Sequence, residues 1–303
     1  MQALGVPLDE LIALRRYASE YQYKPRSEAQ RSGSWLSPTR GRGMDFAEVR
    51  NYQAGDEIRH MEWRVTARTG RPHVKLYQEE RERPVILLSD FNPSMYFGTR
   101  LALKSQTAAR LAALIAWTAA KEGDRVGGII FSDARHDEYL PRGRERGVLP
   151  YLSGLAQYSE KIPEDFHQSQ PLSAILMRSR RVIRPGSTIA IISDGYYCDE
   201  DSERHLRRLC QHNLVILYQV CDPIELQPPP PGSYVMSNGK EEVVVDNRHR
   251  SVQDLWQDSC VQRQQQLAHL CKRLMIQHSI VQTGDDLAKT VWQSFPRRRH
   301  GAY

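Results

Sequence analysis

Two short polar runs follow two of the most apolar runs in the sequence, and both carry residues that could bind a metal ion. The run VILLS is followed by DFNPS (residues 90–94), and TIAII is followed by SDG (193–195). Alternate residues of an extended loop point the same way, so oxygens of Asp90, Asn92 and Ser94 can converge on one point. With Asp194 they form a hard ligand set that suits Mg²⁺ or Mn²⁺. The alternative is that the two aspartates cap the helices that follow them.

The same aspartates allow a second chemistry. With Mg²⁺ bound, Asp90 and Asp194 could orient a water against a phosphate, as in a metal-dependent phosphoesterase or nuclease. An aspartyl phosphotransferase would usually carry a second aspartate where Asn92 stands, and a nuclease would carry more carboxylates. The sequence has no G-x-x-x-x-G-K-[ST] phosphate loop and shows no nucleophile beside a base. We therefore expect a binding role and no catalytic residues.

Cysteine and charge usage argue against several other classes of protein. The five cysteines are an odd number without a C-x-x-C pair, which argues against a disulfide framework and a structural zinc site. The net charge is +6, but only residues 297–300 form a purely basic run, so nucleic-acid binding is not favoured. No apolar stretch approaches the length of a membrane span, and the first residues lack the features of a signal peptide. We expect a cytoplasmic protein.

The spacing of apolar residues predicts an α/β domain that brings the two polar runs to one edge of a sheet. Strands are expected at 85–88, 125–131, 188–193, 213–220 and 278–281, with a hairpin over 234–246 around an Asn-Gly pair. Helices are expected at 99–121, 145–158, 172–184, 201–212, 252–274 and 285–295. This alternation indicates a mostly parallel sheet flanked by helices, whose ligands gather beyond the carboxyl ends of the strands.

Three parts are expected along the 303 residues. Residues 1–82 form a mixed α+β extension, with one helix over 8–21 and then short strands and turns. Residues 83–296 form the α/β domain, and residues 297–303 form a basic tail. The side chains expected to be buried in the extension are Tyr52, Trp63, Val65, Val74 and Leu76.

The two polar runs resemble the metal-ion-dependent adhesion site of von Willebrand factor A domains. In that family the first loop reads D-x-S-x-S, and a threonine and a second aspartate complete a magnesium shell with one position left for a partner's carboxylate. Here Asn92 replaces the first serine. At the position of the threonine the sequence has Ser169 and Gln170, one of which would have to substitute. The resemblance implies a Rossmann-like von Willebrand factor A-like fold and a degenerate magnesium site.

Residues 41–81 (GRGMDFAEVRNYQAGDEIRHMEWRVTARTGRPHVKLYQEER) are similar to the hallmark segment of the bacterial "domain of unknown function 58" family. Its members join this segment to a von Willebrand factor A-like domain. The resemblance implies a partner of MoxR-type AAA+ ATPases that engages a client protein. The matching residues are Gly41, Gly43, Asp45, Phe46, Val49, Arg50, Tyr52, Gly55, Asp56, Arg59, Glu62, Trp63, Ala67, Arg68, Glu79 and Arg81.

Arginine and aromatic residues in this segment suit a docking face for another protein. The candidates are Arg50, Asp56, Arg59, Trp63, Arg68 and Arg81. The alternative is a structural network in which the four arginines pair with Asp45, Asp56, Glu62 and Glu79. Both interpretations remain open from the sequence.

Overall fold

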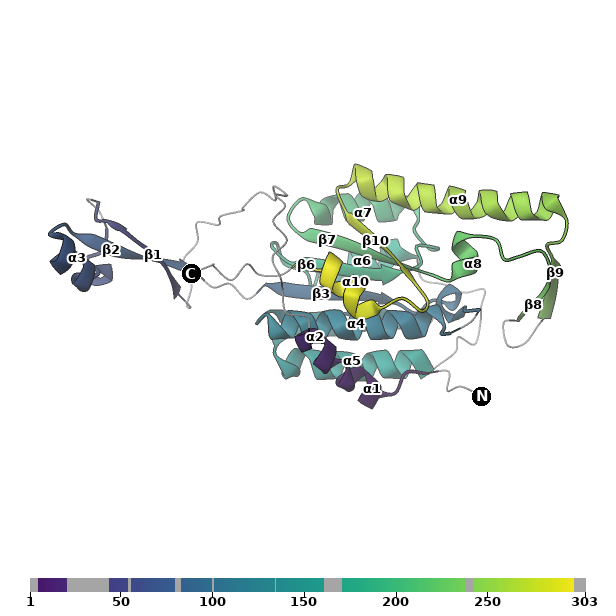
Figure 1. Ribbon diagram of the computed structural model, residues 1–303, viewed down its shortest axis with the longest axis horizontal. Helices are drawn as coiled ribbons and strands as arrows, with labels where there is room; N and C mark the ends of the chain where they lie inside the picture. Colours follow the sequence, from purple (N-terminus) through teal and green to yellow (C-terminus); the bar gives the residue numbers. More distant parts are fainter. Residues whose placement is uncertain are drawn as a thin grey trace. The chain divides into compact units, whose positions relative to one another are not determined.

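The computed structural model describes residues 5–20, 44–53, 56–79, 83–99, 101–133, 135–160, 171–237 and 242–296 (Figure 1). For residues 19–20, 44–48 and 76–79 it describes the backbone alone. The chain forms two compact units. The larger unit joins residues 1–23 to 83–303, and the smaller unit is residues 24–82.

A six-stranded sheet forms the centre of the larger unit, with the strand order β10-β7-β6-β3-β4-β5. Five strands are parallel, and β5 runs antiparallel to β4 at one edge. The strands are β3 (Pro84–Asp90), β4 (Arg125–Phe131), β5 (His136–Gly143), β6 (Thr188–Ser193), β7 (Leu214–Cys221) and β10 (Gln277–Gln282). The predicted α/β class with a mostly parallel sheet is confirmed.

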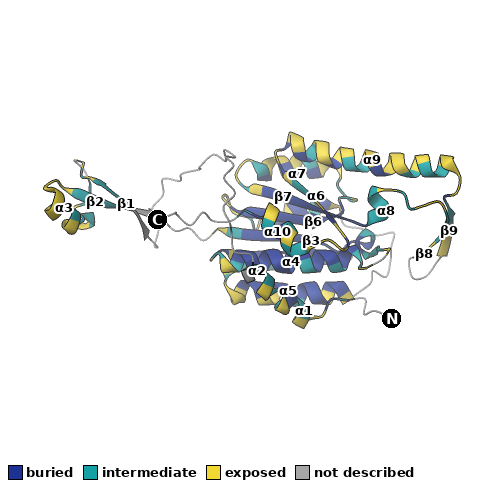
Figure 2. Cartoon of the chain, viewed as in Figure 1, coloured by how far each residue is buried: buried dark blue, intermediate teal, exposed yellow. Residues whose placement is uncertain are grey.

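Helices cover both faces of this sheet (Figure 1). Because side chains alternate along a strand, Val85 and Leu87 enter one core while Ile86 and Leu88 enter the other. The first core is closed by α1 (Leu8–Ala13), α4 (Lys104–Lys121), α5 (Glu145–Glu160) and α10 (Leu287–Ser294). The second is closed by α6 (Leu172–Ser179), α7 (Glu200–Cys210) and α9 (Arg250–Arg273). Figure 2 shows α4 as the most deeply buried of these helices.

The N-terminal helices belong to the larger unit, although the sequence predicts them as part of an extension over residues 1–82. Leu11 of α1 is fully buried, and its carbonyl accepts a hydrogen bond of 3.0 Å from Trp117 Nε1 in α4. The amide of Val6 donates to Ser159 Oγ at 2.9 Å. The helix α2 (Arg15–Glu20) follows. An amphipathic helix shows only that it has an apolar face, and the sequence did not indicate which unit that face covers.

The smaller unit consists of β1 (Met44–Asn51) paired antiparallel with β2 (His73–Glu79), together with a short 3₁₀ helix η1 (Ile58–His60) and α3 (Trp63–Thr69). Val74 is buried as predicted, and Tyr52 and Val65 are half-buried. The prediction that Trp63 is buried is wrong, because its side chain is 65% exposed. Among the residues of this unit that the structure describes, the pair of strands and the short helices form no second layer that covers the indole.

Two further elements depart from the predicted boundaries. The strand β5 was not predicted, because it is an edge strand without a fully buried residue and carries Pro141 near its end. The helix α4 begins at Lys104 rather than at Thr99, whose amide and hydroxyl both bond to Asp222.

The expected hairpin is present as β8 (Ser233–Ser237) and β9 (Glu242–Asp246), and its turn lies outside the described residues. The predicted basic tail at 297–303 lies outside them too. Among the helices that the structure describes, none combines the length and the apolar composition needed to cross a bilayer.

Candidate functional site at the strand ends

The candidate site lies where the chain changes direction across the sheet. The strands β3 and β6 are neighbours, and the chain leaves β3 toward β4 on one side and β6 toward β7 on the other. Open α/β sheets bind ligands in the crevice that such a reversal leaves beyond the carboxyl ends of the strands. Asp90 is the last residue of β3 and Asp194 follows β6, and each is only 2% exposed. The two aspartates predicted from the sequence therefore lie at the same edge of the sheet, at the carboxyl ends of neighbouring strands.

Asp90 is held by its own loop and by the end of the neighbouring strand. Its Oδ2 accepts a hydrogen bond of 2.6 Å from Ser193 Oγ, and its Oδ1 accepts one of 2.8 Å from the amide of Asn92. Burial, together with the nearby charge of Asp194, raises the pKa of Asp90 to about 7, and the hydrogen bonds from Ser193 and Asn92 oppose that rise.

The pKa of Asp194 is shifted in the opposite direction from that of Asp90. Burial alone would raise its pKa, but the ammonium of Lys104 more than offsets this and holds the pKa below its usual value. Lys104 Nζ lies 2.8 Å from Asp194 Oδ2, and the amide of Tyr196 donates to Asp194 Oδ1 at 3.0 Å. Ser94 lowers this pKa further, although its buried Oγ makes no well-formed hydrogen bond within the described residues.

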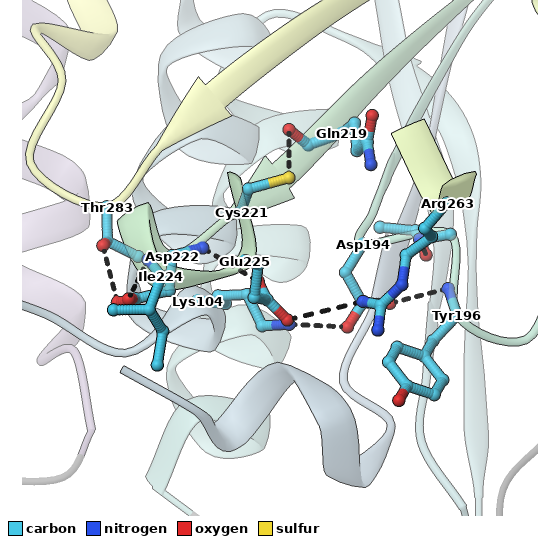
Figure 3. Close-up of polar contacts among 12 residues, drawn as sticks. Lys104, Asp194, Tyr196, Gln219, Cys221, Asp222, Ile224, Glu225, Arg263 and Thr283 are labelled. Carbon is cyan, nitrogen blue, oxygen red and sulfur yellow. Dashed lines mark hydrogen bonds and ion pairs between the residues drawn. The ribbon is translucent and has the colours of Figure 1, made fainter. Parts of the chain in front are cut away.

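Lys104 is a fully buried cation between two carboxylates (Figure 3). Its Nζ donates to Asp194 Oδ2 at 2.8 Å and to Glu225 Oε1 at 2.7 Å. Burial lowers the pKa of a lysine, but the two carboxylates outweigh it here and the pKa is raised. Glu225 belongs to α8 (Pro223–Leu226), and its Oε2 accepts from the amide of Asp222, which fixes the carboxylate toward Lys104. A buried ammonium is tolerated only with such partners.

A third strand ends in a buried carboxylate that has a structural role. Asp222 follows β7, is fully buried, and accepts hydrogen bonds from Thr99, Thr283 and the amide of Ile224. It ties the loop before α4 to the loop after β10. Asp222 also follows an apolar run, as Asp90 and Asp194 do, so the same sequence signal could have identified it.

The outer rim of the site is formed by an arginine stacked on a tyrosine (Figure 3). The guanidinium carbon of Arg263, from α9, lies 4.0 Å from the centre of the Tyr196 ring, and Arg263 Nη1 lies 3.6 Å from Glu225 Oε1. Tyr196 is 54% exposed and the Arg263 side chain is 38% exposed. The pair is accessible, whereas the carboxylates beneath it are buried. We refer to these residues, with the loop 90–94, Lys104, Asp194 and Glu225, as the strand-end site.

The family model described as "Protein of unknown function DUF58" matches residues 48–266. The chain belongs to the DUF58 family. The family predicted from the sequence is thereby confirmed. This DUF58 chain is 28% identical over 239 residues to the uncharacterized protein Rv1480 of Mycobacterium tuberculosis (strain H37Rv), covering 78% of this chain and 73% of that protein. The uncharacterized protein Mb1516 of Mycobacterium bovis has the same values.

Two solved structures resemble the DUF58 chain at low identity. One is the conserved hypothetical protein BatB from Bacteroides thetaiotaomicron, with a TM-score of 0.44, 17% identity, and coverage of 70% of this chain and 96% of that one. The other is the SpRpn10 VWA domain, with a TM-score of 0.39, 11% identity, and coverage of 71% and 96%.

The hydrogen bonds of Asp90 and Asp194 bear on whether these residues can hold a metal ion. All four carboxylate oxygens of Asp90 and Asp194 already accept a hydrogen bond, one of them from the ammonium of Lys104. Within the described parts of the chain, no three His, Cys, Asp or Glu side chains are grouped to hold a metal ion. As arranged, these residues do not fit a divalent ion, because Lys104 would first have to leave Asp194.

Mg²⁺ binding by the predicted set of Asp90, Asn92, Ser94 and Asp194 stays a prediction. The structure brings these four residues to the strand-end site, with Asn92 fully buried. The predicted substitutes for the threonine, residues 169 and 170, lie outside the described residues. The alternative that the two aspartates cap the helices that follow them is wrong. The N-cap of the short 3₁₀ helix η2 (Pro93–Tyr96) is Asn92, that of α4 is Leu103 and that of α7 is Asp199.

In the smaller unit of the DUF58 chain, the hallmark residues form local ion pairs. Arg50 makes a two-pronged bridge to Asp56, with Nη1 2.9 Å from Oδ2 and Nη2 2.8 Å from Oδ1. Arg59 pairs with Glu57 at 2.6 Å rather than with the acidic residues predicted for it. Glu62 pairs with Lys75 at 2.6 Å and begins α3 by accepting from the amide of Arg64.

The remaining docking candidates differ in accessibility. Arg68 and Trp63, both on α3, are exposed. Arg81 lies outside the described residues, as do the side chains of Asp45 and Glu79. The structural-network interpretation therefore holds for Arg50 and Asp56, while Trp63 remains available to a partner.

Proposed function

We propose that this chain is a non-enzymatic adaptor that binds other proteins and works with a MoxR-type AAA+ ATPase. Its membership of the DUF58 family supports the proposal, because the resemblance to that family is what implies such a partner. The ATPase would supply the energy, since the sequence has no phosphate-binding loop of its own. The client protein would dock at the strand-end site.

The exposed Arg263–Tyr196 pair is the observation that carries this proposal. Arginine and tyrosine are the side chains that most often dominate the energy of protein interfaces. Here the ring fixes the guanidinium, and the buried ion pairs of Lys104 hold the floor of the site in place. A partner would therefore meet a preorganised surface and lose little side-chain entropy on binding. The guanidinium fork favours a carboxylate from the client.

A second surface, on the smaller unit, suits the ATPase. Ile58 and Trp63 are each 65% exposed, and the Arg59 side chain between them in sequence is 75% exposed. Exposed large apolar side chains that lie beside an arginine are typical of binding sites. We propose that the ATPase docks on this surface, which leaves the strand-end site free for the client.

Affinity capture from native lysate tests both surfaces. The tagged wild-type chain is expected to retain an AAA+ ATPase and at least one further protein, identified by mass spectrometry. Arg263→Ala should lose the further protein and keep the ATPase, and Trp63→Ala should do the reverse. Running each capture with Mg²⁺ and with EDTA shows whether a metal takes part.

Arg207→Ala is the matched control, because Arg207 is an exposed arginine of α7 that pairs only with Glu203 on the same helix among the bonds of the described residues. It should retain the same proteins as the wild type. Capture of the same proteins by the wild type, Arg263→Ala and Trp63→Ala would overturn the proposed surfaces.

The alternative function is a Mg²⁺-dependent phosphoesterase or nuclease that uses Asp90 and Asp194. The raised pKa of Asp90, about 7, favours it, because such a carboxyl can donate or accept a proton near neutral pH. The test is hydrolysis of generic phosphoesters and single-stranded DNA in Mg²⁺ by the wild type and by Asp90→Ala. Turnover that disappears in Asp90→Ala would replace the adaptor proposal with this one.

A further inference from the structure

We propose that the ammonium of Lys104 is the resident cation of the strand-end site, bound to Asp194, one of the residues predicted to hold a divalent metal, so that the site assembles without metal. The inference goes beyond the proposed function, because it concerns how the site is built and holds whether or not a client binds there.

The position of the ammonium is the first argument. Lys104 Nζ lies 2.8 Å from Asp194 Oδ2 and 2.7 Å from Glu225 Oε1, so it bridges the carboxylate after β6 and a carboxylate of α8. Bridging carboxylates from separate elements is the task that a bound ion performs in a metal site. An ammonium meets the same oxygens with three hydrogen-bond donors and a single positive charge.

The rigidity of Lys104 is the second argument. It is the first residue of α4, its amide donates to the carbonyl of Phe97 at 2.9 Å, and Ser105 next to it is also fully buried. Its side chain is 1% exposed, so it has no direct route into solvent. A lysine at the surface could swing aside for an arriving metal ion, whereas this one would have to be displaced from inside the core.

The local charge is the third argument. Asp194 and Glu225 supply two negative charges, which Lys104 and the nearby Arg263 balance. A divalent ion added to this group would bring an excess of two positive charges when Asp90 is protonated, or of one when it is ionised, next to an ammonium that is enclosed in the core. Repulsion between charges at such short range in a buried site is strong. The site should therefore reject Mg²⁺ in the wild type and accept it only when the lysine charge is removed.

Thermal unfolding of the full chain with and without millimolar Mg²⁺ or Mn²⁺ tests this inference, together with calorimetric titration of the metals. The wild type should show no metal-dependent rise in Tm and no heat of binding. Lys104→Met should unfold about 10 °C lower, because it leaves Asp194 without its counter-charge. Millimolar Mg²⁺ or Mn²⁺ should then recover part of that loss.

A second variant separates loss of charge balance from loss of packing. Lys104→Met/Asp194→Asn removes one charge of each sign, so it should recover stability without metal and show no response to Mg²⁺. Lys121→Met is the matched control, since Lys121 is an exposed lysine at the other end of the same helix, and it should behave as the wild type. If Lys104→Met does not fold, the wild-type titration and the double variant still test whether the lysine takes the place of a metal ion.

A wild-type chain that binds Mg²⁺ with a rise in Tm would overturn the inference, as would a Lys104→Met variant as stable as the wild type. These outcomes are independent of the capture experiment. A chain that captures no partner would contradict the proposed function, but it would not affect the inference that Lys104 is the resident cation.

Discussion

Asp90 and Asp194 are the same residue type at equivalent ends of neighbouring strands, yet their surroundings move their pKa values in opposite directions. Both carboxyls are buried, which disfavours the charged form of each. Of the two aspartates, Lys104 contacts only Asp194, so Asp194 stays ionised while the pKa of Asp90 rises to about 7. Near neutral pH the site therefore holds one carboxylate that is always charged and one that changes its charge.

This difference predicts a pH dependence of stability. The pKa of Asp90 is about 7 in the folded chain against an ordinary value of 3.8, so the folded state binds this proton more tightly. The resulting stabilisation is complete below about pH 4 and is lost as the pH rises through 7. In Asp90→Asn the side chain stays neutral at every pH. Relative to Asp90→Asn, the free energy of unfolding of the wild type should fall between pH 4 and 8, by up to about 4 kcal/mol.

Urea denaturation of both proteins at several pH values measures this difference. Parallel curves for the wild type and Asp90→Asn would show that Asp90 titrates at an ordinary pKa. Asp246→Asn is a suitable control: Asp246 is an exposed carboxyl paired with Arg248, whose pKa is lowered rather than raised. Because Asp90 is intact in Asp246→Asn, its stability should fall between pH 4 and 8 in parallel with that of the wild type.

At this scale, the sequence predicted half of the strand-end site. Aspartates that follow apolar runs are a local signal, so Asp90 and Asp194 could be found by inspection. Lys104 and Glu225 could not, because their contacts join residues 90 and 121 positions apart. A lysine at the start of a helix is also usually exposed, and only its burial reveals that it needs acidic partners.

Among the elements, continuous apolar runs gave the most accurate boundaries. The strands β4 and β6 begin and end at the predicted residues, because both are buried central strands. The edge strand β5 was missed for the opposite reason, since its exposed residues carry no apolar pattern. The start of α4 was predicted five residues too early, because the bonds from Thr99 to Asp222 involve a residue far along the chain.

The close approach of β3 and β4 predicts that Gly128 cannot be replaced. A Cβ at this position would collide with the backbone carbonyl of Leu87 on the neighbouring strand. We expect Gly128→Ala to lower the free energy of unfolding by about 1–3 kcal/mol or more, because the sheet must shift to make room. Chemical denaturation measures the effect.

Gly143, the last residue of the neighbouring edge strand β5, is the control for that substitution. A Cβ there would meet open space, so Gly143→Ala should change stability little. Equal losses in the two variants would show that backbone flexibility, and not the crowding between β3 and β4, determines the effect.

On the scale of the whole molecule, the N-terminal helices are part of the core of the larger unit. Leu11 is fully buried although more than 70 residues separate it from β3. We expect Leu11→Ala to destabilise the larger unit by about 2–5 kcal/mol, as for other buried leucines. Denaturation followed by tryptophan fluorescence is suitable, because Trp117 bonds to the carbonyl of Leu11.

Arg15→Ala controls for effects on the same helical segment. Arg15 makes an ion pair with Glu145 that is exposed on both sides, and its guanidinium lies 5.3 Å from the centre of the Trp117 ring, so its loss should cost about 2 kcal/mol or less. An equally mild effect of Leu11→Ala would contradict the assignment of residues 5–20 to the core of the larger unit and would favour the predicted N-terminal extension over residues 1–82.

The order in which the ribosome releases the chain gives the buried ammonium of α4 one more consequence. Lys104 is synthesised 90 residues before Asp194 and 121 residues before Glu225. Until those counter-charges emerge, enclosing its side chain is costly, so α4 cannot settle on the nascent sheet. Fragments that stop before residue 194 would carry an unmatched charge and stay open to chaperones and proteases. The same ion pairs that shape the strand-end site would thus delay the packing of α4 until the acidic partners of Lys104 have been synthesised.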